Sequence, residues 1–92
     1  MATLAMLFNG TIIKMRGERN GRHHRAHIHA WRDDDNVAVF DVLTRRILRK
    51  TGKFSPDEIY HIKSFIAKHE AELLANWRLL NQDNATWFKI EP

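Results

Sequence analysis

The chain of 92 residues is 43% hydrophobic and 28% charged, and its formal net charge at pH 7 is +4. It contains no cysteine and no long apolar run, which excludes disulfides, thiolate metal sites, a cysteine nucleophile and a membrane-spanning helix. From this length and composition we expect one cytoplasmic domain, residues 1–92, with a single modest core.

Two short apolar segments at the start of the chain predict a β-hairpin. They comprise residues 3–8 and 11–16, and the pair between them, Asn9 and Gly10, tolerates the positive φ angles of a two-residue turn. The charged, glycine-punctuated segment 17–25 has no hydrophobic periodicity and predicts a loop.

Four of the six histidines lie here: His23 and His24 at the end of this loop, and His27 and His29 in the next segment, which predicts a second hairpin. Small or apolar residues alternate with His27, His29 and Trp31, which is typical of a half-buried strand. Pairing this strand with segment 37–42 across three consecutive aspartates puts His27 opposite Asp41. A slip of one residue would move the Asp41 carboxylate to the apolar face, so the sequence favours the register in which the histidines share a face with Asp41.

The second part of the chain predicts one more strand and a helical region. The strand is centred on Ile47 and Leu48, and a capping box formed by Ser55 and Glu58 begins a helix. Apolar residues then recur at spacings of three and four as far as Leu80. The expected fold class is α+β, an antiparallel sheet of four or five strands followed by one long or two consecutive helices packed on one face. We expect residues 1–54 to be mainly β and basic, 55–82 helical and 83–92 a short extended tail.

Several motifs of this chain occur in the same order in a known family. They are AMLFNGTIIKMR, the histidines of HHRAHIHA, AVFDV, HEAELLANW and the closing KIEP. In them the chain resembles, over nearly its whole length, the bacterial family of domain of unknown function 4160. Two departures are Ala26, where the family usually has proline, and LTRRILRK, which is basic where the family turn is rich in glycine and acid. On the family's pattern the characteristic positions are His23, His24, His27, His29, Asp41, His69, Leu73 and Trp77.

The same resemblance implies a partner. Members of the family are often encoded beside a second small protein, in an arrangement that resembles a toxin–antitoxin pair. By this resemblance, we expect the chain to bind a small protein encoded next to it.

The first candidate role of the histidine cluster is metal binding. His27 and His29 lie at i and i+2 on one strand and therefore project from the same face, where His24 could supply a third ligand from the loop. The spacing permits zinc or another divalent metal without requiring it, so we expect no essential cofactor, and a solvated histidine face stays open. His69 lies on the apolar stripe of the helix and is either a core residue or a fourth member of the cluster.

The second candidate role is proton transfer. A metal-independent ribonuclease needs a base for the 2′-hydroxyl, an acid for the leaving oxygen and cations for the phosphate. His27 and His29 could act as base and acid, with Asp41 as the carboxylate that orients them. Whether the protein is an enzyme stays open at this point.

The third role, which is our leading prediction, is binding without chemistry. Residues 1–54 carry 11 Lys and Arg against 5 Asp and Glu, whereas residues 55–92 carry 4 against 6, and a basic segment favours a polyanionic partner. We predict a small interaction or nucleic-acid-binding protein, plausibly one component of a toxin–antitoxin-like two-protein module, that binds RNA or DNA and no membrane. The candidate contact residues are Arg22, Arg25, Trp31, Arg32, Arg45, Arg46, Arg49 and Lys50.

Overall fold

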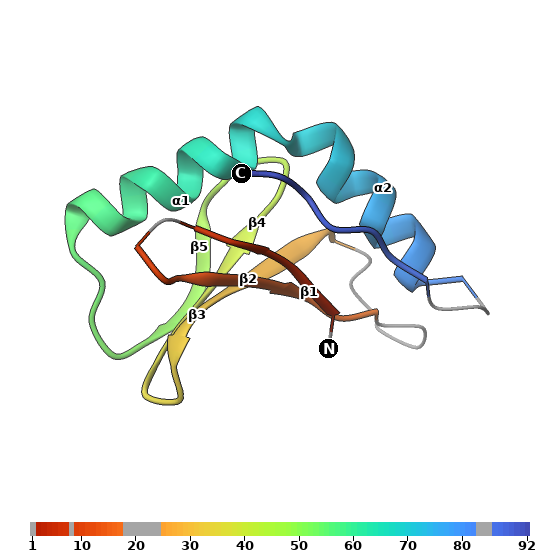
Figure 1. Ribbon diagram of the computed structural model, residues 1–92. Helices are drawn as coiled ribbons and strands as arrows, with labels where there is room; N and C mark the ends of the chain where they lie inside the picture. The colour runs from red at the N-terminus through yellow and green to blue at the C-terminus, as the bar shows by residue number, and fades with distance from the viewer. Residues whose placement is uncertain (1, 8, 18–24, 83–85) are drawn as a thin grey trace.

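The computed structural model describes residues 2–7, 9–17, 25–82 and 86–92, and in these ranges the chain forms a five-stranded antiparallel sheet and two helices (Figure 1). The strands lie in the sheet in chain order. The elements are β1 (Ala2–Met6), β2 (Ile12–Met15), β3 (His27–Asp33), β4 (Asn36–Asp41), β5 (Ile47–Thr51), α1 (Pro56–Lys68) and α2 (Glu70–Leu80). The α+β prediction is confirmed, with five strands and two consecutive helices. Neither helix is long and apolar enough to cross a bilayer, in the part of the chain that the structure describes.

The first hairpin forms where the sequence predicted it, but its turn is longer. Met6 pairs with Ile12, and the Leu7 amide donates to the Thr11 carbonyl over 2.8 Å, so three residues rather than two separate the paired ends. Gly10 has a φ of +90°, the left-handed conformation that closes a three-residue hairpin loop. Phe8, the predicted end of the first strand, lies outside the described residues.

The second hairpin has the predicted register. His27 lies opposite Asp41, Ile28 opposite Phe40 and Trp31 opposite Val37. Its turn is shorter than predicted, because Asp33 pairs with Asn36 and a register shift falls between Trp31 and Asp33. The extra residue on β3 is Arg32, whose side chain contacts the start of α1.

The core lies between the helices and the face of the sheet that they cover, which we call the inner face (Figure 1). Alternation along each strand sends apolar side chains to this face, and the helices contribute residues at spacings of three and four. The side chains with no exposed surface include Leu4, Ile13, Met15, Ile28, Phe40, Ile62, Ile66 and Leu73. The other face, which we call the outer face, carries no helix (Figure 1).

The two edges of the sheet differ in whether another segment covers them. The segment after α2 runs beside β1, where the Ile90 amide donates to the Leu4 carbonyl over 2.8 Å. Asn76 of α2 fixes this segment, since its side chain accepts from the Phe88 amide and donates to the Phe88 carbonyl. At the opposite edge, all five residues of β5 are exposed, and among the described residues no backbone group pairs with its outer side. The predicted extended tail therefore covers one edge and leaves the other open.

Candidate nucleic-acid interface

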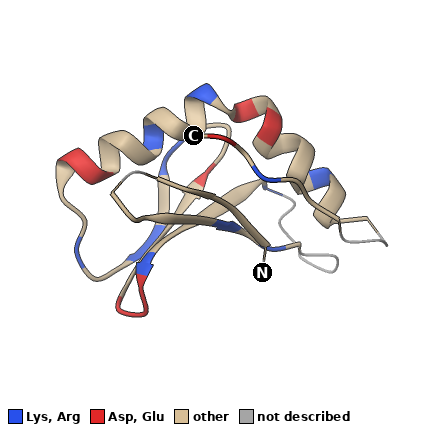
Figure 2. Cartoon of the chain, viewed as in Figure 1, with Lys and Arg blue, Asp and Glu red and all other residues tan. Residues whose placement is uncertain are grey.

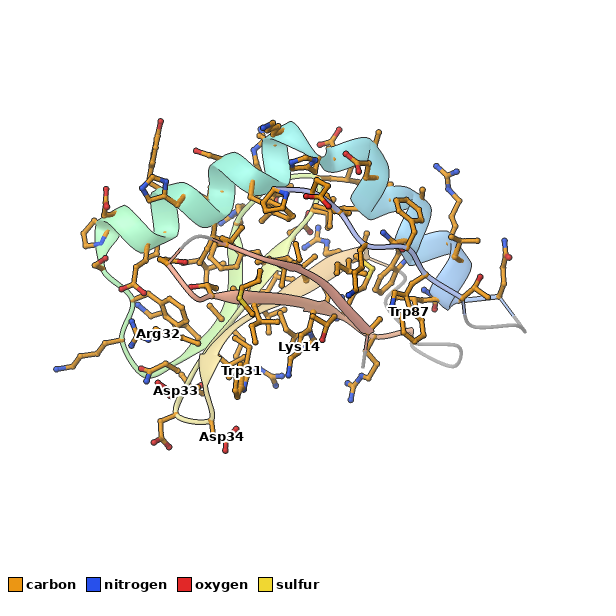
Figure 3. All side chains as sticks on the ribbon, in the orientation of Figure 1. Lys14, Trp31, Arg32, Asp33, Asp34 and Trp87 are labelled. Atoms are coloured by element: carbon orange, nitrogen blue, oxygen red, sulfur yellow. The ribbon has the colours of Figure 1, made fainter. Side chains whose placement is uncertain are left out.

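The outer face presents basic and aromatic side chains in register. One row across the sheet contains Lys14, His29, Val39 and Arg49, and the adjacent row contains Ile12, Trp31, Val37 and Thr51. The ammonium group of Lys14 lies 4.4 Å from the centroid of the Trp31 ring. Figure 3 shows both side chains on the side of the sheet that faces away from the helices. A cation over one face of a partly exposed indole supplies the two groups that a nucleotide uses, one for its phosphate and one for its base.

Three of the predicted contact arginines are engaged in ion pairs. Arg25 Nε lies 2.8 Å from Asp41 Oδ2, Arg32 Nη1 lies 2.7 Å from Glu58 Oε2, and Arg45 Nη1 lies 3.6 Å from Glu70 Oε1. Arg32 also donates to the Lys53 carbonyl, so its side chain joins the sheet to the helix. These three guanidinium groups therefore form contacts within the protein itself. Arg22 lies outside the described residues.

The remaining predicted cations lie together on the edge strand. Arg46, Arg49 and Lys50 are exposed, and no ion pair between residues that the structure describes involves them. Figure 2 shows Lys and Arg on the strands and acidic residues at the tip of the second hairpin. Of the predicted contact cations in the described ranges, those without an ion pair therefore lie on or beside β5.

The two strand histidines contact each other, and His27 also contacts α2. Their ring centroids lie 5.5 Å apart in an edge-on arrangement, and the His27 ring lies 5.0 Å from the Trp77 ring. His27 Nδ1 is 3.0 Å from the Arg25 carbonyl oxygen, which can only accept, so this nitrogen carries a proton. Both side chains are half-buried, as the alternation predicted.

Asp41 lies opposite His27 but is engaged elsewhere. Its Oδ1 accepts from the backbone amides of Leu43 and Thr44 at 2.8 and 2.9 Å, and its Oδ2 faces Arg25. The residue is 1% exposed, so these partners compensate for the burial of its charge. Asp41 holds the turn after β4 and positions Arg25, and it makes no hydrogen bond to His27 or His29.

A metal site would require the side chains of the predicted histidines to lie close together, and His69 would join it only if it reached His27 and His29. No set of three His, Asp or Glu side chains comes together within the described ranges. His24, the predicted third ligand, lies outside those ranges, so the three-histidine site stays a prediction. His69 is buried between the helices, where its Nδ1 lies 2.7 Å from Glu72 Oε1 and its ring packs on Phe65. These contacts are those of a core residue.

Two residues with clear roles were absent from the sequence prediction. Lys14 would have been found by extending the strand register from β3 to β2, which places it beside His29. Asn76 gave no local signal, because an asparagine within an amphipathic helix is usually solvated, and here it is fully buried.

Comparison with known proteins identifies one family. The family model described as a domain of unknown function, DUF4160, matches residues 10–78. No curated protein and no solved structure matches the chain.

Proposed function

Since the chain belongs to the family described as a domain of unknown function, DUF4160, which names no activity, we propose from its geometry that it binds single-stranded nucleic acid on the outer face of the sheet. The observation that carries the proposal is the Lys14 and Trp31 pair, formed across two adjacent rows of outward side chains. A base stacks on the face of the Trp31 ring that Lys14 does not cover, Lys14 contacts the adjacent phosphate, and Arg49 contacts the strand further along.

Single strands fit this surface better than a duplex. A helix or ribbon that enters a groove needs to project from the protein, whereas this face is a sheet with side chains of moderate length. Open sheets with aromatic side chains instead bind bases that are already unstacked. RNA and DNA share the stacking and phosphate chemistry, so the experiment includes both.

The test is fluorescence anisotropy with labelled single-stranded RNA and DNA, and a duplex, over a range of salt concentrations. Replacing Trp31 with alanine should weaken binding about tenfold, since one stacked base contributes about 1–3 kcal/mol. Lys14→Ser and Arg49→Ser should each lower the salt slope by about 0.7, the value for one phosphate contact on a single strand.

Matched controls lie outside the outer face. Trp87 is 50% exposed in the segment after α2, and Lys63 is exposed on α1. Trp87→Ala and Lys63→Ser therefore remove an exposed indole and an exposed ammonium group at positions outside the outer face. We expect both controls to bind as the unmodified protein does. Absence of binding to either nucleic acid, or equal losses in Trp31→Ala and Trp87→Ala, would overturn the proposal.

We further propose, from the family resemblance, that the protein acts in the cytoplasm as one component of a two-protein module resembling a toxin–antitoxin pair. Co-expression with the product of the adjacent gene, followed by size-exclusion chromatography, tests this. Separate elution of the two proteins would contradict it.

A further inference from the structure

The outer edge of β5 is an unpaired strand edge. The other edge of β5 pairs with residues Val37 through Phe40 of β4. Alternate residues of a strand direct their amide and carbonyl groups away from a given neighbour, so part of the β5 backbone faces outward. Among the described residues none bonds to it, whereas the edge of β1 is covered by the segment that contains Ile90. Proteins usually protect such edges, and an open one is a template for another strand.

The side chains along this edge combine apolar surface with positive charge. Ile47 and Leu48 are 37% and 44% exposed, although both are large aliphatic residues. Arg46 and Lys50 flank them and are exposed. A surface of this composition favours an apolar segment that also carries negative charge.

A hollow lies at the start of β5. It has a volume of about 300 Å³ and is lined by Arg25, Thr44, Arg46, Ile47 and Leu48. Arg25 is fixed there through its Nε by the buried Asp41, while its side chain remains 60% exposed. The terminal amino groups of Arg25 are therefore held in position and remain available to a carboxylate.

We propose that β5 binds an extended segment of a partner protein by strand addition, and that this segment alternates apolar and acidic residues. The backbone of the segment pairs with the open edge, and its apolar side chains, which all lie on one face, contact Ile47 or Leu48. One carboxylate enters the hollow beside Arg25 and Arg46. This proposal goes beyond nucleic-acid binding and concerns the backbone edge of β5, a strand whose Arg49 also belongs to the proposed nucleic-acid site.

Two other occupants fit less well. A second copy of the chain would bring Arg46, Arg49 and Lys50 of both copies together, and like charges opposed on paired strands are destabilising. A nucleic acid would satisfy the cations but offers no strand of amide and carbonyl groups, and it would leave Ile47 and Leu48 without apolar contact. Both occupants are therefore outcomes that the experiment separates.

The experiment uses a fluorescein-labelled peptide of alternating valine and glutamate and a second peptide of alternating valine and lysine. By anisotropy at low salt, the glutamate peptide should bind at least about tenfold more tightly. Two further glutamate peptides carry N-methyl groups on one or the other set of alternate amides, and at least one should lose binding because it cannot donate to the edge. In NMR spectra of the labelled protein, the amide shifts should fall on residues 46–51.

Substitutions on β5 test which side chains bind the glutamate peptide. Arg46→Ser and Leu48→Asp should each weaken the glutamate peptide about fivefold or more, whereas Lys63→Ser on α1 should not. The amide spectrum of each variant checks that the fold is unchanged. Trp31→Ala should leave peptide binding intact, so failure of the nucleic-acid proposal and failure of this one are distinguishable.

The following results would overturn the inference. The first is equal binding of the glutamate and lysine peptides, and the second is full binding of both N-methylated peptides. The third is a concentration-dependent dimer that Leu48→Asp abolishes, because the edge would then pair with a second copy. The fourth is displacement of the peptide by a single-stranded oligonucleotide that shifts the amides of residues 46–48, beyond the Arg49 contact that the nucleic-acid proposal already expects.

Discussion

The guanidinium group of Arg32 in β3 donates to the Glu58 carboxylate over 2.7 Å and thereby joins the sheet to the first turn of α1. The other carboxylate oxygen of Glu58 accepts from the Ser55 amide at 3.0 Å, and the Glu58 amide donates to the Ser55 hydroxyl at 3.1 Å. The capping box predicted from the sequence is thus confirmed. One carboxylate serves both the helix cap and the contact with the sheet.

The first prediction concerns acid stability. The Ser55 amide, and then Arg32 and the Ser55 side chain, lower the pKa of Glu58 below its ordinary 4.5, with burial opposing them. A lowered folded pKa contributes stability above pH 4.5 that is lost as the pH falls through the folded value. Glu58→Gln should therefore lower the urea midpoint at neutral pH and reduce its dependence on pH in the acid range. Glu91→Gln, an exposed change in the last segment, is the control and should leave both unchanged.

The second prediction compares two positions in the helical region. Ser55→Ala removes the cap acceptor and should cost about 1 kcal/mol in the free energy of unfolding. Trp77 is 8% exposed and contacts His27, so Trp77→Ala should cost about 3 kcal/mol or more. Chemical denaturation of both variants measures the order. A larger loss at Ser55 would contradict the assignment of Trp77 to the core.

The third prediction concerns Gly17, where the chain after β2 approaches the end of α2. A Cβ at this position would overlap the Leu80 carbonyl group, so Gly17→Ala should destabilise the fold by about 1–3 kcal/mol. Gly10→Ala is a useful comparison, because it meets no neighbouring atom within 4 Å and tests only the positive φ of the turn. Unfolding curves that show no loss for Gly17→Ala would mean that the end of α2 can shift without cost.

The fourth prediction concerns the segment that covers β1. Asn76→Ala removes both side-chain hydrogen bonds to Phe88 and should release this segment, at a cost of about 1–3 kcal/mol. Hydrogen exchange at the Phe88 and Ile90 amides should become faster while exchange in β3 changes less. Asn76→Asp retains the acceptor for the Phe88 amide but puts a buried carboxylate against the Phe88 carbonyl oxygen, so it should cost at least as much as Asn76→Ala. Unchanged exchange in Asn76→Ala would show that other contacts hold the segment.

The fifth prediction separates binding from catalysis. If the protein binds RNA without chemistry, RNA incubated with it should stay intact under conditions of saturating binding. The ribonuclease alternative predicts cleavage that His27→Ala and His29→Ala together abolish, and gel analysis of the products decides between them. Equal cleavage by the unmodified and doubly substituted proteins would indicate a contaminating nuclease.

The sequence by itself determined the elements whose signals are local. Alternation assigned β3 and β4, and the cost of burying Asp41 against Ile28 selected their register correctly. Ser55, Pro56 and Glu58 are close together in the chain, so the start of α1 could be assigned without knowing the fold. Turn lengths were less certain, since Asn9 and Gly10 suit loops of two or three residues and only the pairing of Met6 with Ile12 distinguishes them.

Only the tertiary structure decided which charged and polar groups meet across the chain. Asp41 lies opposite His27 in the register, yet its carboxylate accepts from amides of the turn after β4 and forms an ion pair with Arg25, which the strand pattern could not reveal. Asn76 and Phe88 are brought together by the path of the chain after α2. Strand and helix periodicity specifies the face on which a side chain lies. Which partner it reaches depends on side-chain length, sheet twist and the return of distant segments, and these follow from packing of the whole core.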